Sequence, residues 1–132
     1  MILVDTSVWV QALRQKECDE ARELARLLDE DQVLLCAPVR MEILSGASRR
    51  DLPTLQRLLS ALPVLYPQRS TWDLATSWIE PAKRRRERFG FADLLIGAQA
   101  AETESSIWSL DRDFERLSKL KLIRLHEPSA NL

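Results

Sequence analysis

The sequence predicts an α/β fold in which helices cover both faces of a parallel sheet. Short apolar runs alternate along the chain with segments whose apolar residues recur at helical spacing. The strand-like runs are apolar at nearly every position, as in Ile2–Val4. This is typical of parallel strands that are buried on both faces. In such a sheet, ligands bind at the carboxyl ends of the strands, where the strand order reverses.

The elements of the first half follow from apolar periodicity and capping residues. Asp5, Thr6 and Ser7 follow the first strand and can cap a helix that begins near Val8. Pro38 can open a later helix, which Gly46 would end. In order, we expect a strand at 2–4, helices from about 8 and at 19–29, a strand at 33–36, helices at 38–45 and 51–61, and a strand at 64–65.

The second half continues the alternation. Pro81 should either kink a helix at 71–79 or begin a separate charged helix that reaches Arg88, before Gly90 breaks the chain. Residues 92–101 are apolar nearly all round, which predicts a buried helix. Strands at 106–110 and 122–125 flank a short helix at 113–117, so the sheet has four to five strands. The tryptophans fall in apolar stripes, and we expect all of them in the core: Trp9, Trp72, Trp78 and Trp108.

The composition is that of one globular domain, which we expect to span residues 1–132. Hydrophobic residues make up 45% of the chain and charged residues 30%. No apolar run approaches the roughly 20 residues of a membrane-spanning helix. Met1 leads directly into a strand-like run without the basic start of a signal peptide. We therefore expect a cytoplasmic protein.

Several kinds of chemistry are disfavoured. Cys18 and Cys36 lie far apart without a CxxC partner, so we expect reduced structural thiols and not a disulfide or a zinc site. The only histidine, His126, lies in a polar tail, which argues against imidazole-based catalysis. The net charge is −1, so any affinity for nucleic acid must come from a local basic patch.

Four acidic residues lie where predicted strands end or helices begin, and each has an ordinary alternative role. Asp5 and Asp111 follow the first and fourth strands, but either could simply cap the next helix. Glu42 lies on a helix face of small and apolar residues, although it could pair with a nearby arginine at the surface. Asp93 is the lone acid in a segment that should be buried, and its alternative role is again a helix cap.

These acids would meet if the fourth strand pairs with the first. Like charges at close range repel unless a cation joins them. Oxygen ligands without imidazole or thiolate select a hard ion, Mg²⁺ or Mn²⁺. Such ions can activate water for in-line attack on a phosphodiester, and no protein nucleophile is then required. The pattern therefore predicts metal-dependent phosphodiester hydrolysis.

The densest basic run comes just before Asp93 and is a candidate to hold the phosphates of RNA. Its members are Lys83, Arg84, Arg85, Arg86 and Arg88. The alternative is a solvated helix face whose arginines pair with Glu80 and Glu87.

Four segments, in order, resemble the PIN-domain family, and most of all its VapC-type toxin ribonucleases, over essentially the whole chain. They are ILVDTSV at 2–8, PVRMEILSG at 38–46, FADLLIGA at 91–98 and SLDRDF at 109–114. Each segment alone is a weak signal. Four of them at family-like spacing, in a chain of family-like length, are specific.

The resemblance implies a three-layer α/β/α sandwich with a central parallel sheet, and cleavage of RNA with Mg²⁺ or Mn²⁺. It assigns catalysis and metal binding to four acids: Asp5, Glu42, Asp93 and Asp111. It assigns support of the metal to three further side chains: Thr6, Ser109 and Asp113. The family often has threonine where this chain has Ser109, which keeps the hydroxyl, and Asp113 could replace or assist Asp111.

The resemblance also implies a homodimer and a cognate VapB-type antitoxin that covers the site. Leucine-rich helices at 24–28 and 55–62 could offer the antitoxin a groove, although as core faces they need no partner.

Two alternatives stay open. A receiver-like phosphoacceptor module would need an acid after the third strand and a lysine after the fifth, where this chain has Tyr66-Pro67 and His126-Glu127. A non-catalytic PIN-like RNA-binding or scaffold protein is harder to distinguish, but it would not need to retain all four acids.

Overall fold

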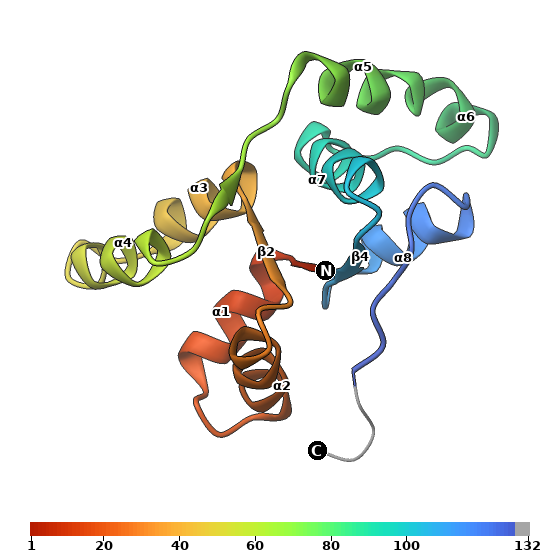
Figure 1. Ribbon diagram of the computed structural model, residues 1–132. Coiled ribbons are helices and arrows are strands. Elements are labelled where there is room, and N and C mark those ends of the chain that lie inside the picture. Colours follow the sequence, from red (N-terminus) through yellow and green to blue (C-terminus); the bar gives the residue numbers. More distant parts are fainter. Residues whose placement is uncertain (129–132) are drawn as a thin grey trace.

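The computed structural model describes residues 1–128, in which helices surround a four-stranded parallel sheet (Figure 1). The elements in chain order are β1 (Ile2–Val4), α1 (Thr6–Arg14), α2 (Asp19–Asp29), β2 (Val33–Cys36), α3 (Ala37–Gly46), α4 (Leu52–Ser60), β3 (Val64–Leu65), α5 (Arg69–Ser77), α6 (Ile79–Arg84), α7 (Phe91–Glu102), β4 (Ser106–Trp108) and α8 (Arg112–Lys119). The predicted α/β class with a central parallel sheet is confirmed.

The strand order β3-β2-β1-β4 places the first strand at the centre of the sheet. β1 pairs with β2 on one side and with β4 on the other, and Val4 lies opposite Trp108. The chain thus moves outward from β1 to β3 and then crosses back to β4. The strand order reverses between β1 and β4, which is where a ligand site is expected in a sheet of this type. The fourth strand pairs with the first, which is the condition under which the acids were expected to meet.

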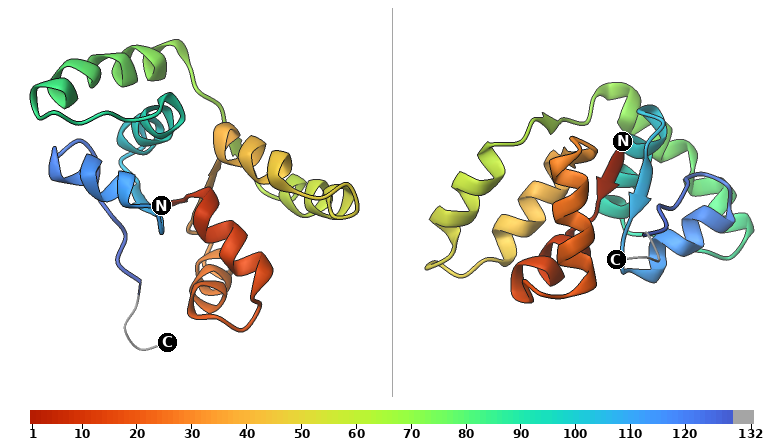
Figure 2. Two further views of the ribbon diagram at one scale, coloured as in Figure 1. Left: turned by 180° about the vertical axis from the view of Figure 1, so that it is seen from behind. Right: turned by 60° about the horizontal axis from the view of Figure 1, so that its bottom comes forward.

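Helices lie on opposite sides of this sheet. Figures 1 and 2 show α1 and α2 on one side and α5, α6 and α7 on the other. The core between the layers includes Leu3, Val4 and Ile107, all fully buried. Helix α7 is buried from Leu94 to Ala100, as its uniformly apolar sequence predicts. No helix within residues 1–128 has the length and apolarity to cross a membrane.

Gly97 allows α7 to approach its neighbours closely. A Cβ atom at this position would lie 3.0 Å from Cζ3 of Trp78 and 3.5 Å from methyl groups of Ile123 and Leu117. The missing side chain therefore makes room for the Trp78 ring, which is itself buried.

Several expected boundaries are wrong: the helix expected at 71–79 is Arg69–Ser77, the one expected at 113–117 is Arg112–Lys119, and three others have a clear local cause. Helix α1 begins at Thr6 and not near Val8, because Asp5 alone is the cap. Helix α6 ends at Arg84 and does not reach Arg88, because the chain turns at Arg86, whose φ is 58°. Strand β4 ends at Trp108 and not at 110, because the chain then turns into the cap of α8.

The expected fifth strand at 122–125 is not formed. Only a single parallel bridge joins Leu125 to Ile107 in the middle of β4, through the hydrogen bonds from Ile107 N–H to the carbonyl of Arg124 and from His126 N–H to the carbonyl of Ile107, both 2.8 Å. The next residue, His126, was expected in a polar tail, but its ring lies edge-on to Trp108 at 5.6 Å between centroids. The segment is therefore held against β4 both by these backbone hydrogen bonds and by the contact between the rings of His126 and Trp108.

One tryptophan is not in the core. Trp9, Trp78 and Trp108 are buried as predicted, but Trp72 is 49% exposed. The face of α5 that packs on α7 is formed instead by smaller residues such as Thr71 and Ala75, both buried. Cys18 and Cys36 are both free, as expected.

Candidate metal centre

Asp5 lies directly after β1, at the point where the strand order reverses, and is only 5% exposed. Its Oδ2 accepts hydrogen bonds from Ser109 Oγ at 2.7 Å and from Ser7 Oγ at 2.9 Å. Its backbone N–H donates to the carbonyl of Trp108 on β4 at 2.9 Å. Within residues 1–128 its Oδ1 accepts no hydrogen bond. Asp5 is thus the cap of α1 and also carries a fixed carboxylate oxygen that is left for another ligand.

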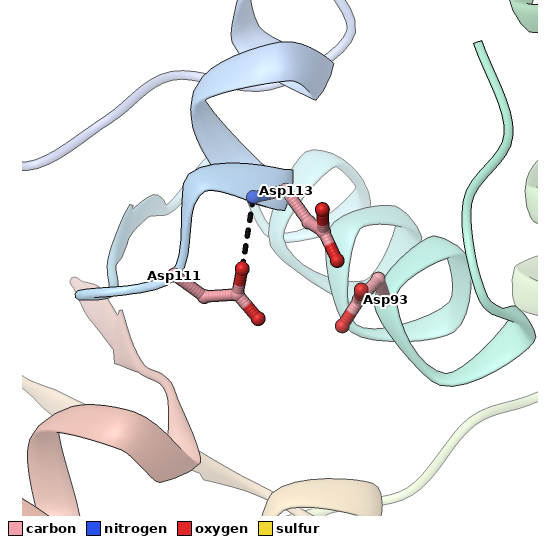
Figure 3. A group of neighbouring side chains, drawn as sticks. All are labelled: Asp93, Asp111 and Asp113. Atoms are coloured by element: carbon pink, nitrogen blue, oxygen red, sulfur yellow. Dashed lines mark hydrogen bonds between the residues drawn. The ribbon is translucent and has the colours of Figure 1, made fainter.

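Three further acids form an acidic trio: Asp93, Asp111 and Asp113. One carboxylate oxygen from each lies within 4.8 Å of the others. Figure 3 shows Asp93 projecting from the first turn of α7 towards Asp113 on α8, with Asp111 beside them. Asp111 caps α8 by accepting from the backbone N–H of Asp113 at 2.9 Å. Two segments that are distant in sequence therefore bring their carboxylates to one place.

Glu42 approaches the same edge of the sheet from α3. Its Oε1 accepts a hydrogen bond from Thr6 Oγ1 at 2.9 Å, so the residue after Asp5 orients it. Burial raises the pKa of Glu42, the Thr6 hydrogen bond lowers it, and the negative charges of Asp5 and Asp111 raise it further. The predicted surface pairing with an arginine is not observed for Glu42 among the residues described.

Asp93 is the most strongly perturbed carboxyl group of this set. Burial raises its pKa to about 7, with further contributions from the hydrogen bond and charge of Asp113 and from the charges of Asp111 and Asp5. A carboxyl group that is crowded by others retains its proton unless a cation offsets the charge. The donors are all carboxylate and hydroxyl oxygens, a set that fits a hard divalent ion such as Mg²⁺ or Mn²⁺.

Two hydroxyl groups connect β1, α1 and β4. Ser109 Oγ, besides donating to Asp5, accepts from the backbone N–H of Asp111 at 2.9 Å. Ser7 Oγ accepts from the N–H of Leu110 at 2.9 Å. Ser109 was expected to support the metal, whereas Ser7 had been considered only as part of a helix cap. Its contact with residue 110 depends on the pairing of two strands that are about a hundred residues apart, which no local pattern reveals.

Arg116 was also missed by the sequence analysis. Its guanidinium lies 3.3 Å from Asp113 Oδ1 and 3.2 Å from Glu87 Oε2, and it donates to the carbonyl of Arg88 at 2.8 Å. It also lies over the ring of Phe89, 4.6 Å from the centroid. Arg116 thus joins the trio to the loop that precedes α7. The helical spacing of Arg116 from Asp113 was the only available signal, and such pairs are common on helix surfaces.

The basic run is exposed and lies before α7. Arg84 pairs with Glu80 at 3.7 Å, as the surface alternative predicted. Glu87 pairs with Arg116 and not with a member of the run. Lys83, Arg85, Arg86 and Arg88 have no ion-pair partner within residues 1–128.

The sequence also matches known proteins along most of its length. The PIN domain family model matches residues 2–120. VapC ribonuclease Mb1587 of Mycobacterium bovis and Ribonuclease VapC11 of Mycobacterium tuberculosis are each 36% identical to this chain over 125 residues, which cover 91% of this chain and 93% of the relative. Both relatives are thus matched along nearly their full length.

Solved structures show the same fold at low sequence identity. VapBC2 from Rickettsia felis, bound to a DNA fragment from its promoter, superposes with a TM-score of 0.79 at 16% identity, covering 96% of this chain and 98% of that chain. VapC20 of Mycobacterium tuberculosis, a toxin described as cleaving the sarcin-ricin loop, gives a TM-score of 0.66 at 20% identity, covering 89% and 95%. With its sequence matched by the family model from residue 2 to residue 120, the chain belongs to the PIN domain family.

Proposed function

We propose that the protein is a metal-dependent endoribonuclease that hydrolyses phosphodiester bonds in RNA, and that it is the toxin of a VapBC-type toxin-antitoxin pair. The observation that carries this proposal is the convergence of acids from distant segments on one edge of the sheet: Asp5, Glu42, Asp93, Asp111 and Asp113. Two relatives that match nine-tenths of the chain are named as VapC ribonucleases.

In this proposal Asp5, Glu42, Asp93 and Asp111 hold Mg²⁺ or Mn²⁺. A bound ion of this kind would supply activation of water and stabilisation of negative charge for phosphodiester hydrolysis. Asp5 is pre-oriented by the hydroxyl groups that bind its Oδ2, which include that of Ser109.

The remaining side chains orient the acids or balance their charge. Thr6 orients Glu42, and Asp113 shares a hydrogen bond with Asp93 that the bound ion would replace. Arg116 offsets part of the charge of Asp113. Because no side chain acts as a nucleophile, the acids need only be held in place and kept charged.

The basic run supplies the affinity for RNA in this proposal. Lys83, Arg84, Arg85, Arg86 and Arg88 lie just before α7, which carries Asp93. Cations that bind phosphates contribute a salt-dependent affinity with little sequence preference. The target RNA therefore has to be selected by other contacts.

We further propose a VapB-type antitoxin and a homodimeric assembly, both acting in the cytoplasm. A hollow of about 610 Å³ between α1, α3 and α4 is a candidate for the antitoxin, and its apolar lining includes Leu13, Leu55 and Leu58. By contrast, Leu24 and Leu27 of α2 are buried core residues and offer no groove. Light scattering on the purified chain would test the dimer, since a mass of 15.2 kDa in solution would contradict it.

The decisive experiment is cleavage of RNA by the purified protein with and without Mg²⁺ or Mn²⁺. We expect cleavage only with the ion, and none from the Asp93→Asn variant. A chain that binds RNA but never cleaves it would instead support the alternative of a non-catalytic PIN-like binding protein. Expression of the wild type and the variant in cells, followed by mapping of cleaved RNAs, would identify the target and test toxicity. The receiver-like alternative is set aside because the chain belongs to the PIN domain family.

A further inference from the structure

A hollow of about 520 Å³ lies between α6, the loop at 85–90 and the first turn of α7. Its lining combines apolar and charged side chains: Ile79, Ala82, Lys83, Arg86, Glu87, Arg88, Phe89, Phe91 and Leu94. Phe91 stands out because it is 74% exposed although it is a large aromatic residue. An exposed aromatic residue in the lining of a hollow is accessible to a ligand with an apolar part.

The charge around this hollow is positive. Lys83, Arg86 and Arg88 have no carboxylate within ion-pair distance in the part of the chain that the structure describes. The one acid in the lining, Glu87, already pairs with Arg116 at 3.2 Å. The hollow therefore offers uncompensated cations around an apolar surface, a combination that suits an anion with a flat apolar part.

The hollow adjoins the candidate metal centre. Phe91 and Leu94 belong to the same helical turn as Asp93. Arg116 donates to the carbonyl of Arg88 and also contacts Asp113 of the acidic trio. A polymer that occupies the hollow would thus lie next to the acids.

We infer that this hollow binds one unpaired nucleotide of the RNA substrate, with its base against Phe91 and its phosphate near Arg86 and Arg88. The inference rests on the proposed ribonuclease function and assigns the hollow beside Phe91 as a subsite for one base of the substrate. Bases of single-stranded RNA stack on aromatic side chains, whereas paired bases in an A-form helix do not present their faces. A protein partner, including a second copy of the chain, would also cover Phe91, because aromatic residues and arginine are enriched at protein interfaces. The uncompensated cations favour a nucleic acid, and loss of a dimer in the Phe91→Ala variant is the outcome that would show a protein partner instead.

The inference is tested by RNA binding in the full chain carrying Asp93→Asn, which separates binding from cleavage. The probe is a short random-sequence single-stranded RNA, compared with the same RNA annealed to its complement, both measured by fluorescence anisotropy. Adding Phe91→Ala should weaken single-strand binding roughly tenfold, the scale of one lost stacked base, and leave duplex binding unchanged. Phe91→Tyr should restore the affinity, which distinguishes lost stacking from a folding defect.

Trp72→Ala is the matched control, because Trp72 is an exposed aromatic residue on α5 outside the hollow. It should leave both affinities unchanged. Equal binding by the Phe91→Ala variant, equal losses for single strand and duplex, or conversion of a dimer to monomers by Phe91→Ala would each overturn the inference.

Failure of the nucleotide site and failure of the ribonuclease function give different results in these measurements. If the wild type cleaves RNA but Phe91→Ala has no effect on binding, the nucleotide site is wrong and the ribonuclease function stands. If the wild type cleaves no RNA and the Asp93→Asn chain binds none, the proposed function itself fails.

Discussion

Asp5 shows how one residue can fill a local and a distant role. Its Oδ2 accepts from the backbone N–H of Ser7, at 3.5 Å, and from the hydroxyl of Ser109, which is far away in sequence. The competing interpretations of this residue as a helix cap or as part of a site are therefore compatible. Substitutions that preserve one role and remove the other can separate them.

We expect Asp5→Asn to abolish RNA cleavage with little loss of stability, because asparagine is an equally good helix cap but carries no charge for a metal ion. Asp5→Ala should also be inactive and should in addition lose about 1 kcal/mol, the usual contribution of a cap. Cleavage assays and urea unfolding of the two variants measure the two effects. Full activity in Asp5→Asn would remove this residue from the proposed site.

The raised pKa of Asp93 predicts how stability depends on pH in the absence of metal. Its ordinary pKa is 3.8 and its folded-state pKa is about 7, so between these values the folded chain retains a proton that the unfolded chain has released. The contribution of Asp93 to the free energy of unfolding should therefore decrease as pH rises through this window. The test is to measure the free energy of unfolding of the wild type and of Asp93→Asn in EDTA at pH 5 and pH 7. It should decrease more between these two pH values in the wild type than in the variant.

Added Mg²⁺ or Mn²⁺ should stabilise the wild type at pH 7, because an ion that binds only the folded state shifts the unfolding equilibrium. The Asp93→Asn variant should gain less stability from the ion, or none, because one of the negatively charged ligands is missing. Thermal unfolding with increasing ion concentration is the measurement. Equal stabilisation of both proteins would place the ion elsewhere.

At the scale of elements, α7 combines the buried layer of the fold with one of the acids. Its residues from Leu94 to Ala100 are buried, and its first turn carries Asp93 to the edge of the sheet. The tight packing of this helix against Trp78 thus bears directly on the position of the acid. Gly97 is the point at which this packing can be tested.

We expect Gly97→Ala to destabilise the protein by up to about 2 kcal/mol. The added methyl group would lie 3.0 Å from the buried Trp78 ring and overpack the core at a cost of about 1–3 kcal/mol, of which the helix propensity of alanine would restore up to about 1 kcal/mol. Gly46→Ala is the matched control, since its Cβ would meet no atom within 4 Å. In a helix end this control should be neutral or stabilising, by up to about 1 kcal/mol. Urea unfolding of both variants tests the contrast, and similar stabilities would contradict it.

At the scale of the whole molecule, the acids and the hollow between α1, α3 and α4 share no residue. The acids lie at the ends of β1 and β4, on α3 and at the first turns of α7 and α8, while the hollow is lined by leucines of α1 and α4 and by Ile43, the neighbour of Glu42 in sequence. A substitution in the hollow should therefore weaken binding of the partner without reducing catalysis. This separation distinguishes an antitoxin site from a substrate site.

Leu58→Asp should weaken binding of the antitoxin at least tenfold, because it places a charge in an apolar hollow that the partner would fill. RNA cleavage by the free protein should be unchanged. Gln56→Asp adds the same charge on α4 outside the hollow and should affect neither property. Calorimetric titration with the product of a neighbouring antitoxin gene is the measurement, and equal affinity for both variants would exclude this surface.

The sequence by itself predicted the fold class, most element positions and the acids that the structure brings to one edge of the sheet. Strands such as β1 are apolar throughout, and helix α7 is apolar on all sides, so their burial follows from composition alone. Asp5 and Asp111 were identifiable because an acid at the end of a strand is placed by the sheet. A sequence pattern is sufficient to predict a structural feature when the residues that cause it are neighbours in the chain.

Only the tertiary structure decided which side chains meet. Ser7 and Arg116 acquired their contacts through strand pairing and through the packing of α8 against the 87–89 loop, neither of which has a short-range signature. Trp72 was expected in the core and is exposed, because periodicity identifies an apolar stripe but not the partner that covers it. Burial and proximity depend on the global arrangement of elements, so they emerge only when the whole chain has packed.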